Sequence, residues 1–178
     1  VLTAPAGAQD PDSTVTIDPV LVRVLRSTVG TGTPHSVSII TGPELTRGTA
    51  GAFLEDALRA MPGVQIHNRF NLAMGERLSV RGFGSRAQFG VRGVRILVDG
   101  IPATLPDGQA TLDHLDLASL GRVEALRGPS SALYGNAAGG VLHFRSLDPV
   151  SEPARLSFRS TSGSHGLLTL QGVLSGQS

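Results

Sequence analysis

The stretch from residue 123 to residue 145 constrains the fold more than any other part of the chain. It reads Val-Glu-Ala-Leu-Arg-Gly-Pro-Ser-Ser-Ala-Leu-Tyr-Gly-Asn-Ala-Ala-Gly-Gly-Val-Leu-His-Phe-Arg. Val123–Leu126 is an apolar run with one charge and predicts a strand, which Gly128 and Pro129 interrupt. Ala132–Tyr134 predicts one helical turn, which Gly135 can close in the left-handed conformation. A glycine pair then leads into a second strand, so the stretch predicts strand, helical turn, glycine turn and strand in close packing.

Residues 49–61 have helical spacing instead. Their apolar residues form one stripe at i, i+3, i+4, i+7, i+8 and i+11: Ala50, Phe53, Leu54, Ala57, Leu58 and Met61. Thr49 is the expected N-cap, and Pro62-Gly63 ends the helix. Shorter segments predict strands at residues 36–40, 64–67, 77–81 and 94–98, and a short helical turn within 112–120. Residues 68–76, 85–93 and 105–112 are expected to be loops.

Residues 155–174 predict a β-hairpin. Leu156 and Phe158 alternate with Ser157 and Arg159, and the leucines of residues 168–174 alternate in the same way after a Gly-Ser-His-Gly turn. One apolar and one mostly polar face is the pattern of transmembrane β-barrel strands, although a soluble amphipathic hairpin has the same pattern.

The composition excludes several classes of function. The 178 residues carry a net charge of +1 and 16% charged side chains, so there is no basic footprint for nucleic acid. Cysteine is absent, which removes disulfides and thiolate metal sites. Lysine is absent as well. The two glycine-rich stretches, residues 82–84 and 135–140, do not have the residue order of a phosphate-binding loop. The one local group of ligand-type side chains, residues 113–116, is best interpreted as a solvated turn, and no catalytic set can be assembled.

The motifs resemble, in order, those of the plug domain of TonB-dependent outer-membrane receptors. In that family a V-E-x-x-R-G-P strand precedes a segment with Ser, then Tyr-Gly, then Ala, then Gly-Gly. This chain has the same order at Val123-Glu124, Arg127-Gly128-Pro129, Ser130, Leu133-Tyr134-Gly135, Ala138 and Gly139-Gly140. Earlier segments are similar to the family's P-G-V, I-R-G-F-G and L-x-D-G-V-P: Pro62-Gly63-Val64, Val80-Arg81-Gly82-Phe83-Gly84, and Asp99-Gly100-Ile101-Pro102. The resemblance covers about residues 15–146.

The resemblance implies an α+β fold, with a plug of mixed β-sheet and short helices followed by the first antiparallel strands of a transmembrane β-barrel. We expect a signal-peptide remnant and linker at residues 1–14, the plug at 15–146, and a linker with the first barrel hairpin at 147–178. Ala6-Gly7-Ala8 fits the end of a secretory signal, and an ordinary disordered start fits equally well.

The implied function is active import across the bacterial outer membrane, without an enzymatic activity or a cofactor. The ligand would be a scarce small molecule, most simply a ferric siderophore, with vitamin B12, another metal complex or a glycan as alternatives. The energy would come from the periplasmic partner TonB, which pairs with an extended segment before the plug. The candidate segment is Thr16, Ile17, Asp18, Val20, Leu21 and Val22, although residues 20–25 also predict a plain first strand of the plug.

The resemblance also assigns roles to arginines. Arg81 and Arg127 each end a predicted strand, where a partly buried guanidinium needs a carboxylate, and in the family such arginines pair with acidic residues of the barrel wall. Plug loops that face outward contact the ligand, and cationic side chains there suit an anionic iron chelate. The candidates are Arg69, Asn71, Arg86, Gln88 and Arg92.

Two other classes of protein remain as alternatives. A soluble α/β binding or enzymatic domain, such as a plug-like binding domain without transport, would fold alone over residues 1–146 around a ligand pocket that holds groups with shifted pKa values, and the sequence offers no such cluster. A passive porin without a plug conflicts with the stretch from Ala50 to Phe144.

Overall fold

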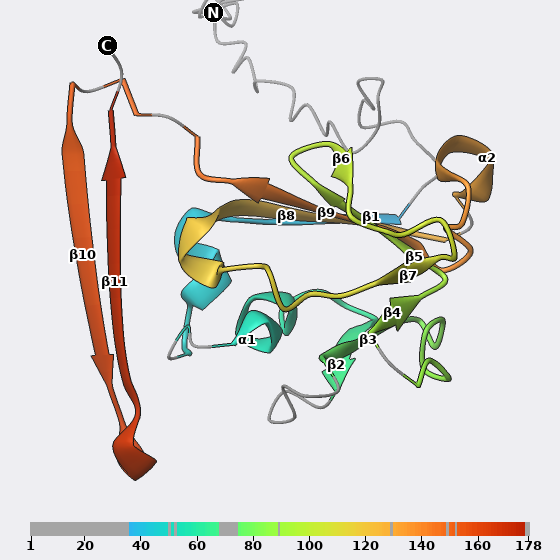
Figure 1. The fold of residues 1–178 in the computed structure, drawn as a ribbon, viewed down its shortest axis with the longest axis horizontal. Helices are drawn as coiled ribbons and strands as arrows, with labels where there is room; N and C mark the ends of the chain where they lie inside the picture. Colours follow the sequence, from blue (N-terminus) through green and yellow to red (C-terminus); the bar gives the residue numbers. More distant parts are fainter. Residues whose placement is uncertain are drawn as a thin grey trace, which may run out of the picture. The chain divides into compact units, whose positions relative to one another are not determined.

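The described part of the chain is built around a five-stranded mixed sheet. The structure, a computed structural model, describes residues 36–176 except 50, 52, 68–74, 89, 129, 149 and 152. The strand order is β1-β8-β9-β5-β6 (Figure 1). The strands are β1 (Ser36–Thr41), β5 (Val94–Val98), β6 (Ile101–Pro102), β8 (Leu120–Arg127) and β9 (Gly140–Ser146). Within this sheet β5 and β9 pair in parallel, and the other neighbouring strands pair antiparallel.

Short helices and two-stranded ladders accompany this sheet. The helices are α1 (Leu54–Leu58), α2 (Ser131–Tyr134) and the 3-10 turns η1 (Gly42–Thr46), η2 (Leu117–Ser119) and η3 (Ser164–Gly166). The antiparallel ladders pair β2 (Val64–His67) with β3 (Arg77–Val80), β4 (Val91–Arg92) with β7 (Gln109–Ala110), and β10 (Arg155–Ser162) with β11 (Leu168–Ser175). The expected α+β class with a mixed sheet and short helices is confirmed.

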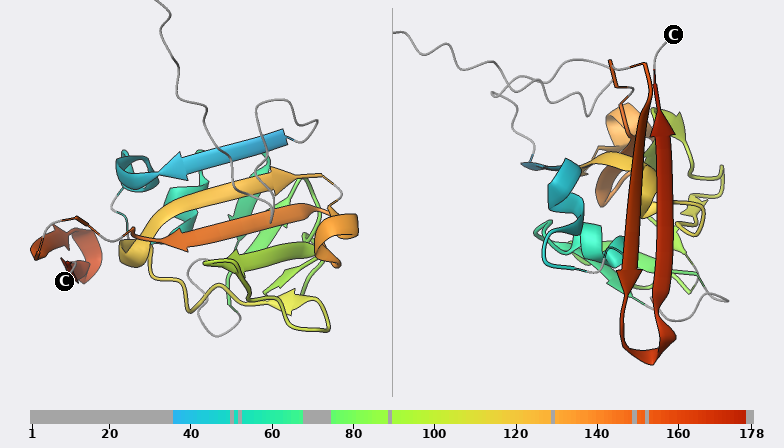
Figure 2. Two further views of the ribbon diagram at one scale, coloured as in Figure 1. Left: turned by 90° about the horizontal axis from the view of Figure 1, so that it is seen from above. Right: turned by 90° about the vertical axis from the view of Figure 1, so that its left-hand side faces the viewer.

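The core lies on one face of the five-stranded sheet. Strand alternation sends Val123 and Ala125 of β8 to this face, together with Leu142 and Phe144 of β9, and all four are at most 1% exposed. α1, β2, β3, β4 and β7 contribute the other side of the core (Figure 1). The intervening residues of β8 and β9 therefore point to the opposite face of the sheet, whose strands lie side by side in the left view of Figure 2.

The central stretch folds as its sequence predicts. β8 and β9 contain both expected strands, and α2 contains the expected helical turn. Gly135 has φ +73°, in the left-handed region that closes a helix. The Cβ of any other residue at Gly140 would lie 2.2 Å from the carbonyl oxygen of Leu126, so the glycine pair allows β9 to approach β8.

The helix predicted from Thr49 is shorter than expected. α1 begins after Phe53, because Gly51 has φ +64°, which no right-handed helix contains. Thr49 therefore does not cap α1. Its hydroxyl accepts a hydrogen bond from the Gly51 N–H at 3.2 Å within a turn.

One further expectation was wrong in detail. Residues 85–93 and 105–112 are not wholly loops, because each contributes two residues to the β4–β7 ladder, where Arg92 faces Gln109. The short helical turn expected within residues 112–120 is present as η2, which Asp116 caps by accepting a hydrogen bond from Ala118 N–H at 3.1 Å.

The hairpin predicted at the end of the chain is present. Leu156 pairs with Leu174 and Phe158 with Gly172, so the apolar side chains of both strands share one face. These side chains are between 61% and 75% exposed: Leu156, Phe158, Leu168, Leu170 and Leu174. Within the described ranges, the helices are too short and too polar to span a membrane.

Candidate functional site

Arg81 and Arg127 are brought together from strands that are distant in the sequence. Arg81 follows β3 and adopts φ +49°, and its N–H donates to the carbonyl oxygen of Gly63 at 2.7 Å. Gly82, with φ +85°, completes the turn, in which Val80 and Phe83 exchange two backbone hydrogen bonds. Arg127 is the last residue of β8, and its Nη1 donates to the carbonyl oxygen of Pro62 at 2.6 Å. Pro62 and Gly63 form the turn that precedes β2, so both arginines contact that turn.

The two guanidinium groups differ in burial. Arg127 is 8% exposed, and its Nε is buried without a hydrogen-bond partner among the described residues. Burial, and then the charge of Arg81, lowers the pKa of Arg127. Arg81 is exposed, and its Nη2 donates to Ser36 Oγ at 3.3 Å. Of the described carboxylates, none lies within ion-pair distance of either arginine.

A second charged group lies on the face of the sheet opposite the core. Glu124 of β8 faces His143 of β9, and Arg122 faces Arg145 in the neighbouring pair. Glu124 is fully buried, and its Oε1 lies 2.5 Å from Arg122 Nε, although neither atom has hydrogen-bond geometry. Its Oε2 lies 3.9 Å from His143 Nδ1. The negative charge of Glu124 therefore lies close to the positive charges of Arg122 and Arg145, and its carboxylate also faces the imidazole of His143.

Burial dominates the electrostatics of this group. It raises the pKa of Glu124 above the ordinary 4.5, and the charges of Arg122 and Arg145 oppose the shift. Burial also lowers the pKa of His143 below the ordinary 6.5, and Arg145 and Arg122 act in the same direction while Asp99 opposes them. Sequence reasoning did not select Glu124 or His143 as site residues. The available signal was one ionisable residue inside each of the apolar runs 123–126 and 141–144.

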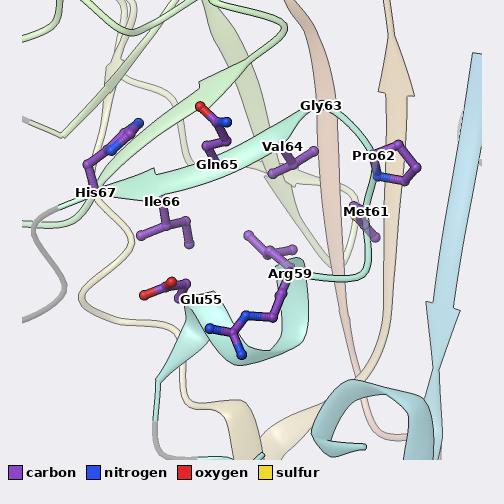
Figure 3. A pocket seen from close by; sticks show the side chains of 10 residues that line it. Glu55, Arg59, Met61, Pro62, Gly63, Val64, Gln65, Ile66 and His67 are labelled. Carbon is purple, nitrogen blue, oxygen red and sulfur yellow. The ribbon is translucent and has the colours of Figure 1, made fainter. Parts of the chain in front are cut away.

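A cavity of about 510 Å³ lies between α1 and β2 (Figure 3). Glu55 of α1 and Arg59, the residue after α1, line it on one side, and Gln65 and His67 line it from β2. It borders the arginine pair, because Pro62 and Gly63 also line it. Its described lining contains no serine, cysteine or lysine that could act as a nucleophile. Among the described residues, no three His, Asp or Glu side chains lie close enough together to bind a metal ion.

The other predicted site residues are separated. Arg86, Gln88 and Arg92 are exposed, and the β4–β7 ladder brings Arg92 beside the turn of residues 105–108. Arg69 and Asn71 lie outside the described residues, as does the whole of the predicted TonB-contact segment, residues 16–22.

The sequence of this chain matches a known protein family. Residues 31–141 match the family described as TonB-dependent Receptor Plug Domain, which is more than half of the chain. The chain belongs to this family. The match confirms the resemblance of the motifs and includes both plug arginines, Glu124 and the β8–α2 connection.

Individual relatives of this plug domain are receptors by name. A hemin receptor from Yersinia pestis is 36% identical over 118 residues, which cover 65% of this chain and 16% of the relative. A pesticin receptor from Yersinia enterocolitica is 34% identical, over 66% of this chain and 17% of the relative. The structure of the ferric yersiniabactin uptake receptor of Yersinia pestis superposes with a TM-score of 0.65 at 29% identity, over 80% of this chain and 22% of the receptor. This plug-domain chain thus spans about a fifth or less of the length of these relatives.

Proposed function

We propose that this chain is the N-terminal part of an outer-membrane receptor that imports a ferric complex, most simply a ferric siderophore, with energy supplied through TonB. The plug would occupy the lumen of the barrel and have no enzymatic role. The observation that carries the proposal is the family match over residues 31–141, together with relatives named for hemin and for ferric yersiniabactin.

The arginine pair supports a plug that sits inside a larger protein. Arg127 is nearly buried next to a second cation, and the described residues supply it with only a neutral carbonyl acceptor. A buried cation without a carboxylate is costly, and a carboxylate from elsewhere in a receptor would offset that cost. We assign Arg81 and Arg127 this plug-to-barrel pairing role.

The terminal hairpin supports a membrane-embedded continuation. Its apolar face is at least 61% exposed at five large side chains, an arrangement that is costly in water and favourable against lipid. Residues 147–178 would accordingly be the linker and first barrel hairpin. The plug would extend over residues 15–146, after a signal-peptide remnant at 1–14.

The exposed arginines support an anionic ligand. Arg86 and Arg92 are both exposed at the two ends of the segment 86–92, and Arg92 faces Gln109 across the β4–β7 ladder. Guanidinium groups bind the carboxylate and phenolate-type oxygens of iron chelates through charge-assisted hydrogen bonds. We propose that Arg86 and Arg92 act with Gln88 of the same segment, and with Arg69 and Asn71 of the preceding sequence segment, as the ligand-contacting residues.

Uptake by cells tests this function. The receptor carrying this plug is produced in a bacterial strain without its own siderophore receptors, and cells are supplied with radiolabelled iron as hemin or as one of several ferric siderophores. Accumulation of one complex is expected, and it should stop when TonB is deleted. Binding without any accumulation would contradict the transport role and favour a binding domain.

The contact with TonB is tested separately. The purified periplasmic domain of TonB is added to the 178-residue chain, and amide NMR shifts are followed. Changes confined to residues 16–22 are expected, because an extended segment can pair with a partner strand. Binding that survives deletion of residues 16–22 would overturn the assignment of this segment.

A further inference from the structure

The turn between β5 and β6 is attached to β9 by three hydrogen bonds. Asp99 has φ +48° and Gly100 φ +83°, the backbone of a tight two-residue hairpin turn. Asp99 N–H donates to the carbonyl oxygen of Phe144 at 2.9 Å, and Asp99 Oδ1 accepts from Ser146 N–H at 2.8 Å. Gly100 N–H donates to Nε2 of His143 at 2.9 Å. The edge hairpin is therefore fixed to the centre of the sheet at its turn.

Only the bond to His143 uses an acceptor that can titrate near neutral pH. A ring nitrogen accepts a hydrogen bond only when it carries no proton, so Nε2 is unprotonated and the neutral ring carries its proton on Nδ1. Nδ1 is buried and points toward Glu124, whose Oε2 lies 3.9 Å away, too far for a hydrogen bond. The His143 side chain is 11% exposed, so little water can reach either ring nitrogen.

The charged groups around the ring come from each strand next to it. β8 contributes Glu124 and Arg122, β9 contributes Arg145, and the β5–β6 turn contributes Asp99. Arg95 of β5 is on the same face, two residues before Leu97, which pairs with His143. Burial and the two nearest arginines favour the neutral ring, whereas Asp99 favours the charged one. The ring is thus neutral when the pH is neutral.

We propose that His143 is a proton-controlled latch, which holds the Asp99–Gly100 turn against β9 at neutral pH and releases it in acid. A second proton on the ring must go to Nε2, where it would point at the Gly100 N–H. That N–H would lose its acceptor, and the new charge would draw the ring toward Glu124 and Asp99. Release of the turn would loosen the edge hairpin β5–β6 while the other sheet pairings remain. This role is independent of which ligand the receptor imports.

An NMR titration of the whole 178-residue chain tests the latch. The ring protons of His143 and the amide of Gly100 are followed from about pH 8 to pH 4, together with hydrogen-exchange protection corrected for intrinsic rates. The two signals should shift with one common midpoint below 6.5. Protection of Gly100 should fall roughly three- to tenfold through that midpoint, as expected for one lost hydrogen bond. The amide of Ser130, which donates to Ala137 at 3.1 Å, should keep its protection.

His143→Gln is the matched variant, because its amide oxygen can accept from Gly100 and does not titrate. Protection of Gly100 should then be independent of pH. The proposal is overturned if the wild-type ring titrates while Gly100 is unaffected, or if the ring stays neutral down to about pH 4. Persistence of the Gly100 transition in the folded variant would also overturn it. If the variant does not fold, the wild-type titration alone decides.

Discussion

Arg127 donates from Nη1 to the carbonyl oxygen of Pro62 at 2.6 Å, across 65 residues of sequence. This contact joins the end of β8 to the turn that precedes β2, and Arg81 is hydrogen-bonded to the next residue of the same turn. Two cations thus converge where the described residues provide only neutral acceptors. The arrangement is costly for an isolated domain and suits a domain that is completed by an acidic partner surface.

Replacing Arg127 by methionine should have little effect on the 178-residue chain and a large effect on the receptor. In the 178-residue chain the substitution removes the stabilising hydrogen bond to Pro62. It also removes two destabilising contributions, the burial of the guanidinium charge and its repulsion by Arg81. The free energy of unfolding should therefore change by no more than about 1 kcal/mol in urea denaturation. In the receptor, where the proposed carboxylate partner would be left unpaired, ligand uptake should fall and the plug should become sensitive to protease.

Arg47→Met is the control for that substitution. Arg47 is exposed and lies 3.8 Å from Glu44, so neither stability nor uptake should change. If Arg127→Met leaves uptake and protease resistance as they are in the Arg47 variant, the plug-to-barrel pairing is wrong.

Glu124→Ala should destabilise the chain strongly. The substitution leaves Arg122 and Arg145 next to each other across β8 and β9 without their common counter-charge. Removing one partner of a buried ion pair costs about 3 kcal/mol or more, measured as the free energy of unfolding in urea. Glu44→Ala, which breaks the exposed pair with Arg47, should cost less than about 0.5 kcal/mol. Similar losses in both variants would show that burial gives Glu124 no special role.

The pH dependence of stability should depend on His143. Its pKa is lower in the folded chain than the ordinary 6.5, so its contribution is present above pH 6.5 and is lost as the pH falls through the folded value. Glu124 has the opposite sign, because its raised pKa gives a contribution that is present below pH 4.5 and is lost as the pH rises. Relative to wild type, His143→Gln should lose less stability on acidification below pH 6.5. Parallel stability curves for the two proteins would contradict this.

Gly140 should tolerate no side chain. A Cβ there would lie 2.2 Å from the backbone oxygen of Leu126, at φ +129°. Gly140→Ala should therefore cost about 3 kcal/mol or more, because β8 and β9 would have to separate. At Gly135, with φ +73° and open space around the position, alanine should cost about 1 kcal/mol. Equal melting temperatures for the two variants would show that β9 can shift away from β8 at little cost.

The elements that could be predicted from sequence are those with strong local signals. The stretch around α2 was predicted because glycine and proline mark its turns, and the terminal hairpin because its apolar residues alternate. The start of α1 was mispredicted, because an apolar stripe does not reveal that Gly51 adopts a left-handed conformation. The β4–β7 ladder was missed because two-residue strands carry no periodic pattern.

The functional residues divide in the same way. Arg81 and Arg127 were selected because family motifs contain them, and the structure adds that they meet at Pro62-Gly63. The contact of Glu124 with His143 depends on the register of β8 against β9. A one-residue slip in that register would separate the two side chains, so the strands had to be placed before the pair could be seen.

TonB-dependent uptake is the most direct test of the proposed receptor function. Cells producing the receptor that contains this plug are given a labelled ferric complex that they bind, and accumulation is compared with and without TonB, and with residues 16–22 deleted. Accumulation that requires both TonB and this segment is the predicted result. Accumulation that continues without TonB would contradict the proposal, because the ligand would then be imported without the energy that TonB supplies.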